Sequence, residues 1–331
     1  MATQDIRQRK TAYLHFPFLV IENPKSPLPI WSAGMSSTVL GYKSYEWKLS
    51  DHTVIQIYAN GLFAFDFSKT EMKMSSKTNN FDLMSWIRTK RSQYINSYLA
   101  CMHSCLIKQG SLYPGYPILS SPDKSISVDD NSAGWGGINT TSLLWKEHPS
   151  INTQDDKNTS QQPLGNHAFV MTAADFEPSR KEFEKLIKKR AAEKDYDLYF
   201  LVDYIFRAGN SFNEHHYDNS ILFSWLVTEA SINKLWLSNI KKLGLTNEDS
   251  KSREWTIHHK HEMLRAIGAI DRSTNDKINI ARKLRNDLVH RHKSINPSNT
   301  KVDEVIKLAL SLLDEAFRIN LDLFLGRSLN W

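Results

Sequence analysis

Helical periodicity, which continues almost unbroken from residue 170 to the end of the chain, is the strongest constraint on the fold. Apolar side chains recur there at spacings of three and four, and residues typical of caps and turns separate the segments. We predict helices at about 178–194, 196–213, 217–242, 252–270, 273–294 and 300–326. Several helices with short connections are typical of a bundle. Residues 170–331 are therefore expected to form an all-α domain.

The N-terminal part of the chain has a different pattern, typical of an α+β domain. Residues 54–59 and 62–67 are apolar and β-branched or aromatic, and they flank Asn60-Gly61. That dipeptide favours a tight hairpin because both turn positions need a positive φ. Residues 42–49 alternate as a neighbouring strand would, and residues 82–108 have the apolar spacing of a long helix. We expect a small sheet with a helix packed on it.

Between these parts the sequence is rich in Ser, Asn, Asp, Thr, Gln and Gly and poor in aliphatic residues. Such a composition is typical of loops and linkers, because it offers little apolar surface to bury. The predicted organisation is an α+β module at 1–121, a polar linker at 122–169 and the helical bundle at 170–331.

Composition and charge place few limits on function. The formal net charge is +6, which permits contact with nucleic acid without requiring it. The only cysteines, Cys101 and Cys105, lie four residues apart in a predicted helix, where we expect buried thiols rather than metal ligands. The N-terminus lacks the pattern of a signal peptide, and the apolar stretch at 13–21 is too short to span a bilayer. A cytoplasmic protein without a membrane partner is predicted.

One motif combines a cation, an amide and a titratable imidazole on a single helix: Arg285, Asn286 and His290. Arg-x4-His alone is expected roughly half a time by chance in this composition, and Arg253 with His258 is such a match. Requiring Asn directly after Arg lowers that expectation to about a few hundredths, and only Arg285-Asn286 meets it. The alternative is a solvated basic helix face.

The helix angles predict how these three side chains are placed. At about 100° per residue, Asn286 and His290 lie about 40° apart, whereas Arg285 lies about 140° from His290. A single chain is therefore expected to hold Arg285 and His290 apart. A second copy related by a two-fold axis would bring both residues of both chains into one composite site.

A helical bundle with R-N-x-x-x-H on its penultimate helix resembles the HEPN superfamily, whose signature is R-x4–6-H. The resemblance covers residues 175–325 and is most specific at Arg285-Asn286-Asp287-Leu288-Val289-His290. It is also similar to the HEPN domains of bacterial anti-phage and abortive-infection proteins, in which an upstream apolar helix carries a glutamate, as residues 221–230 carry Glu229 here. Residues 1–165 resemble no family that we know.

The resemblance implies a metal-independent endoribonuclease that acts as a homodimer, without a cofactor. His290 would accept the proton of a ribose 2′-hydroxyl, Arg285 would stabilise the charged phosphorane and Asn286 would orient the phosphate or the imidazole. Glu229 either orients Arg285 or forms a structural ion pair with another helix. The implied role is a toxin-like effector of antiviral defence. Its N-terminal module would sense a phage-derived trigger, contact a regulatory protein or restrain the nuclease.

Two other functions remain open from the sequence, and one possible metal site is weak. The chain could be a non-catalytic HEPN module that binds RNA, a nucleotide or a partner protein, or it could be a helical scaffold. His258-His259-Lys260-His261-Glu262 invites a metal interpretation, but His258 and Glu262 lack further ligands at a recognised spacing. A solvated helix start is the preferred interpretation there, and no metal site is predicted.

Overall fold

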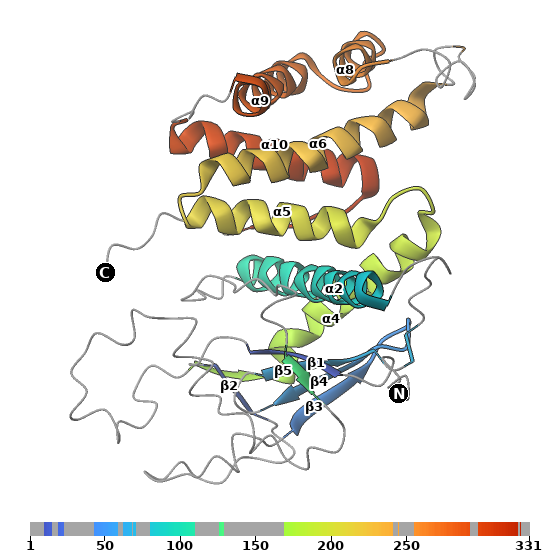
Figure 1. Cartoon of the computed structure of the whole chain (residues 1–331), viewed down its shortest axis with the longest axis vertical. Helices are drawn as coiled ribbons and strands as arrows, with labels where there is room; N and C mark the ends of the chain where they lie inside the picture. The colour runs from blue at the N-terminus through green and yellow to red at the C-terminus, as the bar shows by residue number, and fades with distance from the viewer. Residues whose placement is uncertain are drawn as a thin grey trace, which may run out of the picture. The chain divides into compact units, whose positions relative to one another are not determined.

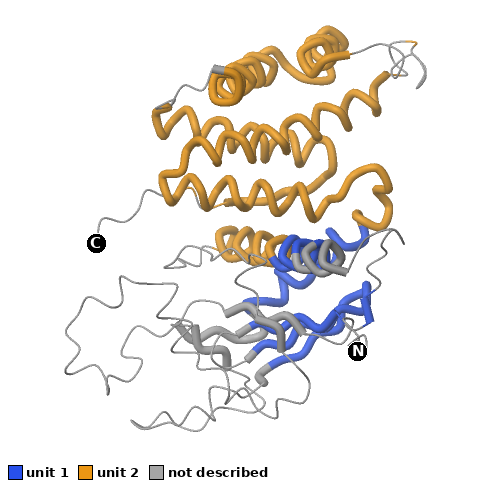
Figure 2. The backbone as a smooth tube through the Cα atoms, viewed as in Figure 1, with its two compact units in different colours: residues 1–95, 120–188 blue, residues 96–119, 189–331 orange. Residues whose placement is uncertain are grey.

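The computed structural model divides the chain into two compact units, residues 1–95 with 120–188 and residues 96–119 with 189–331 (Figure 2). It describes residues 10–14, 19–22, 43–58, 62–67, 69–70, 80–109, 126–128, 169–240, 244, 255–291, 297–323 and 325. The division differs from the predicted boundaries at 121 and 169, because two helices each contribute to both units.

The elements are labelled in Figure 1. The helices are α2 (Asn80–Lys108), α4 (Ala173–Ala192), α5 (Leu198–Asn213), α6 (Tyr217–Asn239), α8 (Ile257–Ala266), α9 (Arg272–Arg291) and α10 (Asn299–Phe317). The strands are β1 (Lys10–Leu14), β2 (Leu19–Glu22), β3 (Lys43–Lys48), β4 (Val54–Tyr58), β5 (Leu62–Asp66), β6 (Ile126–Val128) and β7 (Phe169–Thr172).

The first unit contains a five-stranded sheet of order β3-β4-β5-β1-β6, in which neighbouring strands are antiparallel. The register Ile57↔Phe63 confirms the predicted hairpin, whose turn lies outside the described residues. β2 and β7 form a separate parallel pair. The sequence did not predict β1, β2, β6 or β7. All four are short and pair with strands distant in the chain, so local pattern carries little signal for them.

Aromatic side chains pack the helices of the first unit onto its sheet. Phe63 and Phe65 are fully buried on β5. The Tyr94 ring of α2 lies 5.2 Å from Phe67 and 5.0 Å from Phe183 of α4, both in edge-to-face geometry. Such edge-to-face pairs add to the stability gained from burial alone. The predicted small sheet with a helix packed on it is confirmed.

The second unit is a helical bundle in which α6 contacts α5, α8, α9 and α10 (Figure 1). α6 buries apolar residues along the side that faces these helices, among them Ile221, Trp225, Ile232 and Trp236, whereas Leu226 and Leu237 are exposed. The coarse prediction, an α+β part followed by a helical part, is therefore confirmed. The bundle also includes residues 96–108 of α2, which the sequence placed with the sheet.

The ends of the last two helices have clear physical causes. The Asp271 carboxylate accepts a hydrogen bond of 2.6 Å from the backbone N–H of Thr274, and this contact caps the start of α9. α10 ends at Phe317, where Arg318 adopts a left-handed conformation with φ 57°. The predicted end at Gly326 was wrong, because the apolar pattern continues past the point where the backbone turns.

The bundle buries a histidine, His103 of α2, whose ring lies 5.9 Å from that of Phe206. Burial lowers the pKa of His103 to about 3. An unfolded histidine titrates near pH 6.5, so between pH 6.5 and 3 the unfolded chain binds one more proton at this position than the folded chain. Its contribution to stability is complete above pH 6.5 and is lost as the pH falls, by up to about 1.4 kcal/mol per pH unit.

We therefore expect His103→Leu to flatten the acid dependence of stability. Urea unfolding of wild type and variant between pH 7.5 and 4.5 measures this dependence. The difference in unfolding free energy between wild type and variant at pH 7.5 measures the effect of the substitution on packing. The change in that difference below pH 6.5 measures the effect of proton binding at His103. Parallel curves for the two proteins would contradict the assignment.

Candidate functional site

The motif helix α9 is anchored by its first half. Ile278 and Ala281 are completely buried in a core shared with α6, α8 and α10. One turn later Leu284 is half-buried, so the helix rises toward the surface of the bundle. Arg285 and Asn286 are half-buried at that point, and His290 is exposed.

The three motif side chains meet within one chain. Nη1 of Arg285 donates a hydrogen bond of 3.1 Å to Oδ1 of Asn286. The same Nη1 lies 3.2 Å from Nε2 of His290. The expectation that Arg285 and His290 diverge was wrong, because the long arginine side chain carries its guanidinium around the helix. The angle between Cβ directions does not limit where that group lies.

The contact also defines the state of the imidazole. A guanidinium nitrogen can only donate, so in this hydrogen bond Nε2 of His290 accepts with its lone pair. A hydrogen bond of this kind requires the tautomer that carries its proton on Nδ1. An exposed imidazole with a lone pair directed at a guanidinium has the parts of a general base beside an anion-binding group.

Glu229, the fourth predicted site residue, lies on α6 and contacts a different side chain. Its Oε2 accepts a hydrogen bond of 3.1 Å from the indole Nε1 of Trp225, one turn earlier on α6. Burial lowers the pKa of Lys260 on α8, and the nearby carboxylate of Glu229 opposes that effect. Within the described residues no hydrogen bond or ion pair joins Glu229 to Arg285. Of the two predicted roles, these contacts favour the structural one.

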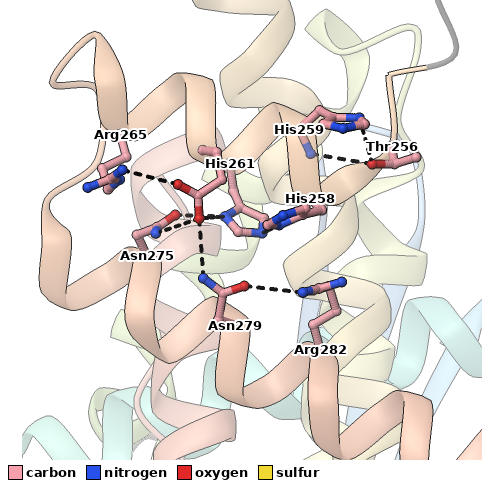
Figure 3. A network of polar contacts seen from close by, with 9 residues as sticks. Thr256, His258, His259, His261, Arg265, Asn275, Asn279 and Arg282 are labelled. Carbon is pink, nitrogen blue, oxygen red and sulfur yellow. Dashed lines mark hydrogen bonds and ion pairs between the residues drawn. The ribbon is translucent and has the colours of Figure 1, made fainter.

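A second polar cluster lies between α8 and α9 (Figure 3). It includes His258, His261 and Glu262, and it reaches Asn275 and Asn279 on the neighbouring helix. The sequence placed the histidines on a solvated helix start, yet His261 is completely buried. The signal that could have found it is the spacing i, i+3, i+4, which puts all three side chains on one side of a helix.

Comparison with family models, with curated proteins and with solved structures finds no match. In the part of the chain that the structure describes, no helix has both the length and the apolar character needed to cross a bilayer. The candidate site is thus defined by its own geometry: a guanidinium, an amide and an imidazole within hydrogen-bonding distance on one helix.

Proposed function

We propose that the chain is a metal-independent endoribonuclease of the HEPN type that acts as a homodimer in the cytoplasm. The observation that supports this most directly is the contact between Arg285 and His290 beside Asn286. Cationic side chains nearby on α9, among them Arg282 and Lys283, favour a polyanionic ligand. A reducing compartment suits the free thiols of Cys101 and Cys105, both buried.

The proposed reaction begins when a phosphodiester replaces His290 as the partner of the Arg285 guanidinium. This exchange frees the Nε2 lone pair to accept the proton of the adjacent 2′-hydroxyl. The 2′-oxygen attacks phosphorus, and Arg285 and Asn286 stabilise the charge that develops on the phosphoryl oxygens. The products are a 2′,3′-cyclic phosphate and a new 5′-hydroxyl end.

The geometry of this displacement favours a dimer. The attacking and leaving oxygens lie on opposite sides of phosphorus, so one imidazole does not reach both. A second copy, related by a two-fold axis, would supply another His290, which in its protonated imidazolium form would give its proton to the departing 5′-oxygen. Arg285 and His290 already meet in one chain, so the dimer would join two complete clusters rather than two halves of one.

The biological setting that we propose is growth arrest during phage infection. A nuclease of this kind requires restraint, and the first unit is the candidate for restraining it or for binding a regulatory protein or phage-derived trigger. This part of the proposal rests on the resemblance of the motif helix.

The first test is incubation of the purified chain with total RNA in EDTA. Cleavage into fragments that end in 2′,3′-cyclic phosphate is the expected result, because no step uses a metal. A His290→Ala chain purified in parallel excludes a contaminating nuclease. RNA that is bound and shifted on a gel but left intact would instead favour the non-catalytic alternative.

The second test addresses the dimer. If both imidazoles act on one phosphodiester, a tenfold excess of the His290→Ala chain, mixed under exchange conditions, should lower wild-type activity roughly tenfold by forming mixed dimers. A tenfold excess of His259→Ala, which changes an imidazole on α8, is the matched control and should not lower the activity. Activity that is independent of added His290→Ala would point to a self-sufficient monomer.

A further inference from the structure

We propose that His258, His261 and Glu262 form a binding site for a divalent transition metal of the Zn²⁺ class, separate from the Arg285–His290 cluster. All three lie on α8, at positions i, i+3 and i+4, and the rings of His258 and His261 lie side by side in Figure 3. The site neither requires nor supplies the proposed nuclease chemistry, and it rests on its own contacts.

The spacing of the donor atoms fits such an ion. One donor atom from each residue lies within 4.8 Å of the other two. Nδ1 of His258 and Nε2 of His261 are 3.3 Å apart. Two ligands of a tetrahedral zinc ion, each about 2.1 Å from the metal, are separated by about 3.4 Å. The imidazoles already have that separation, and the carboxylate needs to approach by up to about 1.4 Å.

The amide of Asn275 determines which nitrogen of His261 carries a lone pair. Its Nδ2 donates a hydrogen bond of 3.0 Å to the Glu262 carboxylate, which can only accept. Its Oδ1 must then be the atom 2.7 Å from Nδ1 of His261, so Nδ1 donates there. The Nε2 of the buried neutral ring is left with its lone pair toward His258. A histidine that donates one ring N–H to an oxygen while its other nitrogen faces a second donor has the arrangement of a metal ligand.

The Glu262 carboxylate is also positioned by its neighbours. Oε1 of Glu262 accepts hydrogen bonds from Asn275 and Asn279, and Oε2 lies 3.3 Å from Nη2 of Arg265. These contacts hold the carboxylate in place and leave lone pairs on Oε2 available to a metal.

The donor set selects the class of ion. Two imidazoles and one carboxylate suit Zn²⁺, Co²⁺, Ni²⁺ or Cu²⁺, whereas Ca²⁺ and Mg²⁺ prefer oxygen ligands. Besides the approach of the carboxylate, metal binding needs a tautomer change at His258, whose Nδ1 proton points to His261 and would move to Nε2 through solvent. Three protein ligands leave a fourth position for water.

A metal bound at these three residues would stabilise the packing of α8 on α9. The ligands lie on α8, but Asn275 and Asn279 on α9 hold two of them in place. Arg282 donates a hydrogen bond of 3.4 Å to Asn279 and extends the network along α9. Asn279 is six residues from Arg285, about 9 Å along the helix axis, so the metal would stabilise the helix that carries the motif.

The test is a titration of the full-length chain, stripped with EDTA and dialysed, with ZnCl₂ by calorimetry and with CoCl₂ as a visible-absorption probe. We expect one tight ion per chain, tetrahedral cobalt bands and a melting temperature that rises by about 5 °C in excess Zn²⁺. His258→Gln should weaken binding at least about tenfold. The matched control is His259→Gln, because the His259 ring instead contacts the Thr256 hydroxyl, and it should bind as wild type does.

Equal metal affinity of wild type, His258→Gln and His259→Gln would overturn the proposal, as would the absence of a stoichiometric site in wild type. Folding of His258→Gln is checked by its melting temperature without metal, which should match that of the stripped wild type. None of these measurements uses RNA, so failure of the metal proposal and failure of the nuclease proposal are distinguishable.

Discussion

His290→Ala is expected to lower the rate constant for RNA cleavage by about 1000-fold or more, since general acid–base catalysis contributes roughly 100- to 10,000-fold. The imidazole is exposed and close to a guanidinium, so its removal should not disturb the core. Single-turnover cleavage of a short RNA oligonucleotide measures the rate constant, and denaturation checks the fold. A decrease smaller than about tenfold would remove His290 from the mechanism.

Arg285→Lys extends the same prediction to the anion-binding group. Lysine keeps the charge but lacks the planar fork that can contact Asn286 and a phosphoryl oxygen together, so we expect a loss of roughly 100-fold. The matched control is Arg282→Lys, three residues earlier on α9, whose described partner is Asn279. Equal losses in the two variants would indicate a general effect of basic charge rather than a specific site.

The second large effect concerns stability. Asp203 of α5 is 2% exposed, and its carboxylate accepts hydrogen bonds from Nδ2 of Asn96 at 2.5 Å and from Nε of Arg207 at 2.8 Å. Removing one member of a buried charged network leaves its partners unsatisfied, which costs about 3–5 kcal/mol. Asp203→Ala should lower the free energy of unfolding by that amount, measured by urea denaturation at pH 7.

The control for Asp203 is a surface pair of similar composition. Asp303 and Lys307 form an i,i+4 ion pair of 2.7 Å on α10, with the lysine largely exposed. Exposed pairs contribute about 0–1 kcal/mol, so Asp303→Ala should have a small effect. If both variants lose the same stability, burial does not decide the cost and our account of the network is wrong.

Sequence periodicity predicted the elements whose partners are close in the chain. The hairpin at β4 and β5 and the helix α2 were placed within a few residues. Pairing between distant segments had no comparable signal, as β2 and β7 show by joining Leu19 to Phe169. The boundaries between the two units could not be predicted from the sequence either. They fall within continuous helices, and the composition of a helix does not change at the point where its neighbours change.

The candidate site shows the same limit at the level of side chains. Residue types and spacing singled out Arg285, Asn286 and His290. The angle between their positions on the helix did not predict where the guanidinium lies, because the arginine side chain is long and flexible. For His258 and Glu262 the third donor, His261, was visible in the sequence. Its burial and its orientation by Asn275 depend on how α8 packs on α9, which spacing within one helix does not reveal.

The path of the chain through α2 determines when the bundle can be assembled. Residues 96–108 belong to the bundle, but the Asn96 side chain pairs with Asp203 and the Ser97 hydroxyl pairs with the backbone of Tyr199. Those partners are 107 and 102 residues farther along, a length of chain that a ribosome translates in roughly 5–20 s. α10, which packs on α6, is made after the motif helix itself. A chain proposed to cut RNA would thus complete its active fold only after α10 has been translated, which is later than the synthesis of Arg285 and His290.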